Sequence, residues 1–185
     1  MKKFIYLIFF TILLTVTLIA TYKISKDSPK SAPKLAEGQS DTAFFRVNIT
    51  IPEFTFNDIF SNDQIFSKKD LEGKYSIVNF FASWCTTCHA EHQILLALND
   101  EKIADIYGIA WRDVDENARQ YLEENGNPFV KVASDGNGLF TKIANIEAVP
   151  ETWIIDKKGN VVMRYRGNLQ EFSINEIKEF LQKNK

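Results

Sequence analysis

Hydrophobic and polar positions divide the chain into strands and helices from about residue 41 onward. The near-continuous apolar run over Tyr75–Phe81 is typical of a central strand buried on both faces. Apolar residues then recur at helical spacing from Cys85 to about Leu98. Further strands are predicted over 105–110, 129–133, 152–156 and 161–166, and further helices over 113–125, 139–144 and from a cap at Ser173 or Asn168 to Leu181. This order predicts an α/β domain with a mixed central sheet.

Polar residues mark the boundaries of several of these elements. Thr55-Phe56 and Gln64-Ile65-Phe66 flank Asn62-Asp63, so we expect a short N-terminal hairpin with its turn at Asn62-Asp63. The stretch Asp113–Glu116 has a capping-box pattern, which predicts the N-terminus of a helix. A second hairpin is expected across Lys157–Asn160, because turn-forming residues there separate two apolar runs.

The N-terminal part of the chain has a different character. Residues 1–3 include two lysines and precede an uncharged, mostly apolar run over 4–22, which at about 1.5 Å per residue spans a bilayer core of roughly 30 Å. We expect an uncleaved single-pass anchor in the inner membrane, with residues 1–3 in the cytoplasm and the remainder on the periplasmic side. A cleaved signal peptide is the alternative. Residues 23–40 have no core-building pattern and predict a linker, which leaves 41–185 as the globular domain.

Composition and charge limit the classes of function that the chain can have. The chain is 45% hydrophobic with a formal net charge of −2, so it can build a core but has no electrostatic basis for binding nucleic acid. Its two cysteines, Cys85 and Cys88, lie three positions apart. A disulfide between them closes a very small loop and contributes little to stability. Such a bond is better suited to being made and broken than to holding the fold.

The Cys85-Thr86-Thr87-Cys88 segment directly follows the predicted central strand and opens a helix. Only a thiolate attacks a disulfide, and the N-terminus of a helix stabilises that anion. Cys88, one turn later, is placed to resolve a mixed disulfide formed by Cys85, and Trp84 is expected to cover one side of the pair. A C-x-x-C pair at this place in an α/β pattern indicates redox chemistry. Thr86 and Thr87 are expected to tune the reduction potential, in a direction that the sequence leaves open.

Two other chemistries use the same segment. Cys85 to His89 also matches a c-type haem attachment signature, with both sulfurs bound to the macrocycle and His89 ligating iron. The apolar strand before the motif weighs against it, as does the scarcity of methionine for a second ligand. A metal site would use Cys85, Cys88, His89 and His92, but this stretch of helix extends over roughly 10 Å, too far for tetrahedral zinc. We therefore predict no metal, and expect both histidines on the helix surface. A membrane-tethered binding or chaperone domain with an incidental disulfide is a further alternative.

Several segments of the chain resemble one family. Ala82 to His92 is similar to the active-site segment of the membrane-anchored, thioredoxin-like TlpA/ResA/DsbE family. The segments that narrow the resemblance to its DsbE, or CcmG, group are Gly126–Phe129, Ser134–Gly138, Val149–Asp156 and Tyr165–Gly167. The resemblance covers roughly Ile51 to Leu181. It implies a thioredoxin fold with an N-terminal hairpin extension, facing the periplasm.

The resemblance also implies an activity and roles for residues. The family contains thiol:disulfide oxidoreductases that need no cofactor, and by position Cys85 is the nucleophile and Cys88 the resolving thiol. Pro150 matches the cis-proline beside the dithiol, although from the pattern alone it is an ordinary turn proline before a strand. Glu91 matches the acidic residue after the motif.

The DsbE group implies clients and partners. The implied reaction reduces the disulfide of the haem-binding Cys-x-x-Cys-His segment of apocytochrome c, directly or through a partner thiol protein, with electrons from a DsbD or CcdA-type membrane transporter. A TlpA/ResA-type reductase that serves other clients, such as copper-site assembly, is the alternative among enzymes.

The chain departs from the family pattern at two places. Thr86-Thr87 replaces the more usual Val-Pro or Glu-Pro, which leaves the potential of the pair undetermined. Asn79 stands at the position of thioredoxin's buried aspartate and cannot act as a base. Glu91 can take that role if it is buried, because a desolvated carboxyl group keeps its proton to higher pH and can transfer it. A solvated helix residue is the other interpretation of Glu91.

Overall fold

The structure is a computed structural model, and it describes Thr15 and residues 43–184. Residues 43–184 lie within one compact unit, Ser40–Lys185. Apart from Thr15, the predicted cytoplasmic tip, membrane anchor and linker over residues 1–40 lie outside the described residues. No helix in the described part of the chain is both long and apolar enough to cross a membrane.

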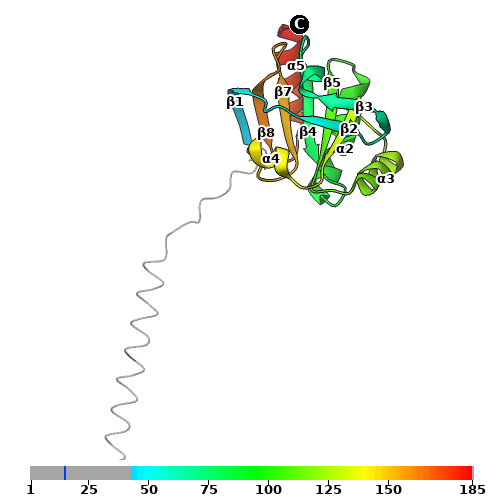
Figure 1. Cartoon of the computed structure of the whole chain (residues 1–185). Coiled ribbons are helices and arrows are strands. Elements are labelled where there is room, and N and C mark those ends of the chain that lie inside the picture. The colour runs from blue at the N-terminus through cyan, green and yellow to red at the C-terminus, as the bar shows by residue number, and fades with distance from the viewer. Residues whose placement is uncertain (1–14, 16–42, 185) are drawn as a thin grey trace, which may run out of the picture. The chain divides into compact units, whose positions relative to one another are not determined.

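A mixed sheet of eight strands forms the centre of the fold (Figure 1). The strands are β1 (Ala43–Thr50), β2 (Thr55–Asp58), β3 (Ser61–Ser67), β4 (Ser76–Phe81), β5 (Asp105–Trp111), β6 (Lys131–Asp135), β7 (Glu151–Ile155) and β8 (Asn160–Arg166). Their order in the sheet is β1-β8-β7-β4-β5-β6-β2-β3. Strands β4, β5 and β6 are parallel, and the other pairs are antiparallel. The predicted α/β domain with a mixed sheet is confirmed.

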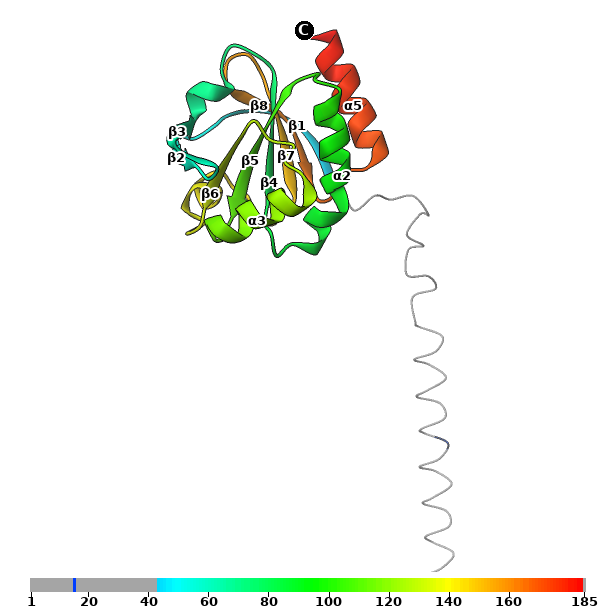
Figure 2. The same cartoon turned by 90° about the vertical axis from the view of Figure 1, so that its right-hand side faces the viewer.

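Helices cover both faces of this sheet. They are α2 (Thr86–Asp100), α3 (Asp115–Asn125), α4 (Leu139–Ile143), α5 (Glu171–Lys183) and the short 3-10 helix η1 (Lys68–Leu71). Buried residues of α2, α3 and α5 form one core with Ile77 and Phe81 of β4, and Figure 2 shows α2 and α5 on the same side of the sheet. Residues of α4 and η1 form the second core with Val78 and Phe80. Because alternate residues of a strand face opposite ways, β4 contributes to both cores and is buried throughout, as predicted.

The N-terminal strands differ from the prediction in two respects. The hairpin of β2 and β3 forms, but its turn lies at Ile59 and Phe60, so the predicted turn at Asn62-Asp63 is wrong. The Asp58 carboxylate sets the turn by accepting the backbone N–H groups of Phe60 at 2.7 Å and Ser61 at 3.1 Å. Strand β1 was not predicted. It is an edge strand whose partner β8 lies more than 100 residues later in the chain, so no local pattern identifies it.

Two helix starts also differ from the prediction. Helix α3 has Val114 as its N-cap and no side-chain cap, so the predicted capping box is wrong. The Asp113 carboxylate instead accepts a hydrogen bond from Ser83. Helix α5 has Gln170 as its N-cap rather than Ser173 or Asn168. Ser173 instead occupies the third helical position, where its hydroxyl accepts the Gln170 N–H at 3.4 Å. Strand β6 begins two residues later than the predicted start at residue 129.

The register places the start of β1 at the same end of the sheet as the C-terminal end of β4. Ala43 is opposite Arg166 in β8, Arg166 is opposite Glu151 in β7, and Glu151 is opposite Phe80 in β4. A single row of residues therefore runs from the first residue of β1 to the end of β4, which leads into Cys85.

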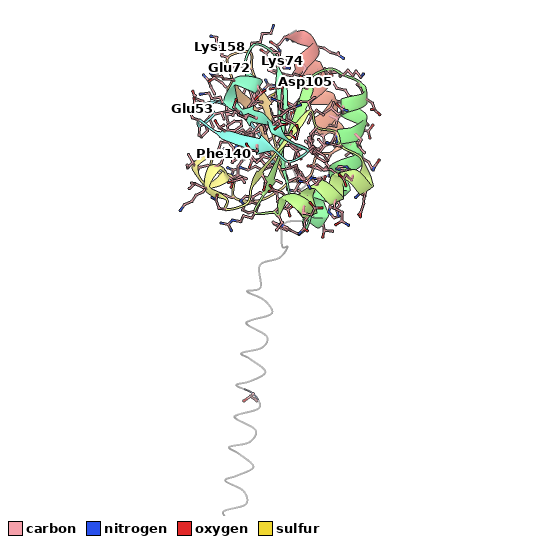
Figure 3. All side chains as sticks on the ribbon, turned by 45° about the vertical axis from the view of Figure 1, so that its right-hand side comes forward. Glu53, Glu72, Lys74, Asp105, Phe140 and Lys158 are labelled. Carbon is pink, nitrogen blue, oxygen red and sulfur yellow. A yellow bond between two sulfur atoms is a disulfide. The ribbon has the colours of Figure 1, made fainter. Side chains whose placement is uncertain are left out.

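The far end of the sheet is where β4 and β5 begin. Lys74 and Asp105 form an ion pair there (Figure 3). Helix α5 runs back to this end, where the ring of Phe180 contacts the ring of Tyr75 with centroids 5.8 Å apart. The C-terminus of α5, marked in Figure 1, therefore lies at the end of the sheet where β4 and β5 begin. Cys85 follows the opposite end of β4.

Candidate active site

The two cysteines lie where β4 passes into α2. Cys85 is the N-cap of α2, and Cys88, one turn into the helix, is joined to it by a disulfide. Cys85 is 5% exposed and Cys88 3% exposed, whereas the neighbouring Trp84 is 56% exposed. The Cys85 sulfur accepts the Cys88 backbone N–H at 3.1 Å, and the Thr87 hydroxyl oxygen lies 3.3 Å from it. The helix start therefore directs hydrogen-bond donors at the sulfur that the sequence nominates as the nucleophile.

The loop before Cys85 is held by the connection between β5 and α3. The Ser83 backbone N–H and hydroxyl donate to the two carboxylate oxygens of Asp113 at 2.5 and 2.9 Å. The Trp84 indole N–H donates to the Arg112 carbonyl oxygen at 3.2 Å. Asp113 is buried, so water does not compete for these bonds. Sequence reasoning missed this function of Asp113, because no pattern in the chain connects residues that are 30 positions apart.

Both histidines of the motif region contact the ring of Tyr121 in α3. His89 stacks on it with centroids 4.5 Å apart and donates from Nε2 to the Ser83 carbonyl oxygen at 2.7 Å. His92 meets the ring edge-on and donates from Nε2 to the Gly126 carbonyl oxygen at 2.9 Å. His92 is buried, which lowers its pKa, so the expectation of a surface position is wrong for this residue because α3 packs over it. Within residues 43–184, no group of three or more His, Cys, Asp or Glu side chains is placed to hold a metal ion.

A buried carboxyl group lies on α2 one turn beyond Cys88. Glu91 is completely buried, and its carboxylate accepts the Asn79 side-chain N–H at 2.9 Å and the Leu169 backbone N–H at 2.7 Å. Asn79 also donates to the Thr152 hydroxyl oxygen at 3.0 Å, from the opposing position in β7. Desolvation raises the pKa of Glu91 to about 7, against the opposing effect of the two hydrogen bonds. The interpretation of Glu91 as a solvated residue is wrong, and the burial needed for proton transfer is present.

Pro150 lies beside the cysteines at the start of β7. The Val149–Pro150 peptide bond is cis, and the Val149 carbonyl oxygen is 3.7 Å from the Cys85 sulfur. The Gly167 backbone N–H donates to the Pro150 carbonyl oxygen at 2.9 Å, which attaches this segment to the end of β8. The backbone at Val149 is therefore adjacent to the reactive sulfur, while the role of Pro150 in exchange stays a prediction.

A second buried glutamate follows Pro150 and was not singled out from the sequence. Glu151 is 1% exposed and contacts Arg164 with Nη2 to Oε1 at 2.5 Å, while Arg166 Nε lies 3.4 Å from Oε2. The Trp153 indole N–H donates to the same carboxylate at 2.6 Å. Because residues of a strand alternate, Glu151 faces the opposite side of the sheet from Thr152. The charge pair joins two neighbouring strands, and recognising it required knowing their register.

Comparison with known proteins gives a consistent result. The family model described as Redoxin matches residues 46–181. The chain is 32% identical over 165 residues to the thiol:disulfide interchange protein DsbE of Vibrio cholerae, covering 89% of this chain and 84% of that protein. It is 29% identical over 167 residues to the protein of the same name from Escherichia coli K12, covering 90% and 85%.

Among solved structures, the chain resembles a secreted thiol-disulfide isomerase from Corynebacterium glutamicum. The TM-score is 0.63 at 18% sequence identity, covering 79% of this chain and 94% of that one. At this identity the likeness concerns the fold alone. It agrees with the strand–dithiol–helix arrangement described above.

Proposed function

The chain belongs to the Redoxin family and is a thiol:disulfide oxidoreductase, and we propose that it acts as a reductant in cytochrome c maturation. Its client in this proposal is the disulfide of the Cys-x-x-Cys-His segment of apocytochrome c. Alternatively, it reduces the disulfide of a partner thiol protein, which then reduces apocytochrome c. The observation that carries the proposal is the 32% identity to DsbE over most of both chains, with the dithiol at the start of α2.

The reaction begins with both cysteines reduced. The Cys85 thiolate attacks one sulfur of the client disulfide, forming a mixed disulfide and releasing the second client sulfur as a thiolate. The Cys88 thiolate then attacks Cys85, which releases the first client sulfur and forms the Cys85–Cys88 disulfide. Two electrons have moved to the client, and the protons lost by the two cysteines balance those that its sulfurs take up. The structure corresponds to the oxidised state that ends this cycle.

In this proposal Glu91 receives the proton that must leave Cys88 before the second attack. Its pKa of about 7 lets the carboxyl group both accept and release a proton near neutral pH. Cys88 and Glu91 are three positions apart in α2 and both are buried, so they share one helix face. Asn79 orients the carboxylate through its side-chain N–H.

The proposed location is the periplasmic side of the inner membrane. The support is the lysine-flanked apolar run over residues 4–22, followed by a linker over 23–40. In an oxidising compartment the dithiol needs an external source of electrons. We assign this to a membrane electron donor of the DsbD or CcdA type, whose own thiols would reduce the Cys85–Cys88 disulfide.

Dithiol chemistry is favoured over haem attachment at the same motif by two observations. The relatives are thiol:disulfide interchange proteins. In addition, the His89 Nε2 that would ligate iron is hydrogen-bonded to the Ser83 carbonyl oxygen, and the ring is stacked on Tyr121.

The proposal is tested by reducing a defined client. The reduced full chain is mixed with a synthetic peptide carrying an oxidised Cys-x-x-Cys-His segment, and free peptide thiols are counted by alkylation and mass spectrometry. We expect stoichiometric reduction, none with Cys85→Ala, and a reduction potential well below about −180 mV. A potential near about −120 mV, that of a strong disulfide oxidant, would contradict the proposal. Equal rates with an oxidised dithiol peptide taken from a copper-binding site would instead support the TlpA/ResA alternative.

A further inference from the structure

Two hydrogen-bond donors converge on the Cys85 sulfur from the first turn of α2. One is the Cys88 backbone N–H at 3.1 Å, and the other is the Thr87 hydroxyl at 3.3 Å. A sulfur in a disulfide carries no hydrogen, so the hydroxyl is the donor in this second contact. The Val149 carbonyl oxygen, 3.7 Å from the same sulfur, is an acceptor and can bond only to a protonated thiol.

Thr87 lies in the first turn of α2, which begins at Thr86. A threonine inside a helix commonly donates to the carbonyl oxygen four residues earlier, but residue 83 precedes α2, so Thr87 has no such helical acceptor. Its hydroxyl is therefore available to the Cys85 sulfur. The preceding residue, Thr86, is exposed, and its side chain forms no hydrogen bond within the described part of the chain. The two threonines of the motif are therefore not equivalent.

We propose that Thr87 is a catalytic residue of this chain, whose hydroxyl donates a hydrogen bond to the Cys85 thiolate and holds the dithiol at a higher reduction potential. A proline at this position would have neither a hydroxyl nor an N–H group to donate. The inference requires dithiol exchange, which the family establishes, and is independent of the client proposed above.

The direction of the shift in reduction potential depends on which redox state carries the negative charge on Cys85. The reduced protein has a negative charge on Cys85, and the hydroxyl stabilises it, whereas the neutral disulfide gains much less. The hydrogen bond therefore favours the reduced state and weakens the dithiol as a reductant. When a donor dithiol resets the protein, two electrons pass to Cys85 and Cys88 as their S–S bond breaks and the donor's disulfide forms. The Thr87 hydroxyl makes this step more favourable, and the reduction of the client correspondingly less so.

The experiment compares three single substitutions in the full chain. Thr87→Val keeps the shape of the side chain and removes the hydroxyl, Thr87→Ser keeps the hydroxyl, and Thr86→Val is the matched control one position away. For each protein, the rate of Cys85 alkylation by iodoacetamide is followed against pH by mass spectrometry. The equilibrium of the dithiol with glutathione redox buffers is measured in parallel.

We expect Thr87→Val to slow alkylation below the thiol pKa by about five- to tenfold and to shift the glutathione equilibrium toward the protein disulfide by a similar factor. Thr87→Ser and Thr86→Val should both match the unaltered chain. The proposal is overturned if Thr87→Val leaves both measurements unchanged, or if Thr87→Ser or Thr86→Val changes them as Thr87→Val does. Because neither measurement uses the client, failure of client reduction leaves the result on Thr87 interpretable.

Discussion

Two buried glutamates lie close to the dithiol on opposite faces of the sheet, and their surroundings differ. Glu91 is 0% exposed and accepts hydrogen bonds from two neutral donors, those of Asn79 and Leu169. Glu151 is 1% exposed and contacts the guanidinium groups of Arg164 and Arg166. Burial alone therefore does not decide what a carboxyl group does. Desolvation without a neighbouring cation raises the pKa of Glu91 to about 7, whereas the Glu151 carboxylate forms ion pairs that connect β7 to β8.

The largest effect on stability is expected when the Glu151 carboxylate is removed. Glu151→Leu leaves the buried Arg164 guanidinium without its counter-ion, so we expect the free energy of unfolding to fall by about 3–5 kcal/mol. Urea denaturation at pH 7 measures this. The double substitution Glu151→Leu with Arg164→Met should regain most of the loss, because it removes the unpaired charge as well.

A matched control for this experiment is Glu147→Gln. Glu147 is exposed and lies 3.9 Å from Arg166, so its removal should change the free energy of unfolding by less than about 1 kcal/mol. If Glu151→Leu costs no more than this control, the Glu151 carboxylate does not stabilise the pairing of β7 with β8.

The second test concerns the titration of Glu91. Its folded pKa of about 7 lies above the value of 4.5 for an unperturbed glutamate, so the folded state binds its proton more tightly than the unfolded state. The stability that this proton provides is complete below pH 4.5 and is lost as the pH rises to 7, a loss of about 3 kcal/mol. Glu91→Gln should remove this pH dependence.

The comparison is made on the pH dependence and not on absolute stability, because glutamine alters the hydrogen bonds to Asn79 and Leu169 at every pH. Urea unfolding of both proteins at pH values from 4.5 to 7.5 gives the two profiles. Parallel profiles would show that Glu91 ionises in this range no differently in the folded and unfolded protein. If exchange kinetics are also unchanged in Glu91→Gln, the proposed proton transfer is wrong.

The smallest effect is expected at Thr152, which shares the Asn79 side-chain amide with Glu91. Thr152→Val removes one hydrogen-bond acceptor while keeping the side-chain shape, so the free energy of unfolding should fall by about 1 kcal/mol. The free energy of unfolding of this variant should still fall between pH 4.5 and pH 7. Loss of that fall would mean that Thr152, rather than burial, controls the Glu91 proton.

The sequence predicted those features that depend on neighbouring residues. The apolar run of β4, the dithiol at the start of α2 and the hairpin of β7 and β8 each have a local pattern. The environment of Glu91 was predicted only conditionally, because burial depends on what packs over the helix. The clamp between Asp113 and Ser83, and the pairing of Glu151 with Arg164, depend on contacts between distant segments. Such contacts leave no periodic signal in a single chain.

The errors in the predicted boundaries have the same cause. The first hairpin turns at Ile59 and Phe60, although Asn62 and Asp63 are more typical turn residues, because the pairing of β2 with β3 sets the register. Aspartate commonly caps helices, but the Asp113 carboxylate accepts a hydrogen bond from Ser83. At Asp113, tertiary structure selected a partner 30 positions away over a local helix cap.

The register of β1 has a practical consequence for anyone who attaches this protein to something else. Ala43 is three strands away from β4 but lies in the same row of residues as Phe80, at the end of the sheet that leads into the dithiol, whereas the last turn of α5 lies at the far end. A fluorophore, affinity tag or sensor surface joined immediately before Ala43 would sit at the end of the sheet that a client must approach. The same group joined after Lys185 leaves that approach open, so biosensors and pull-down reagents made from this chain should carry their attachments at the C-terminus.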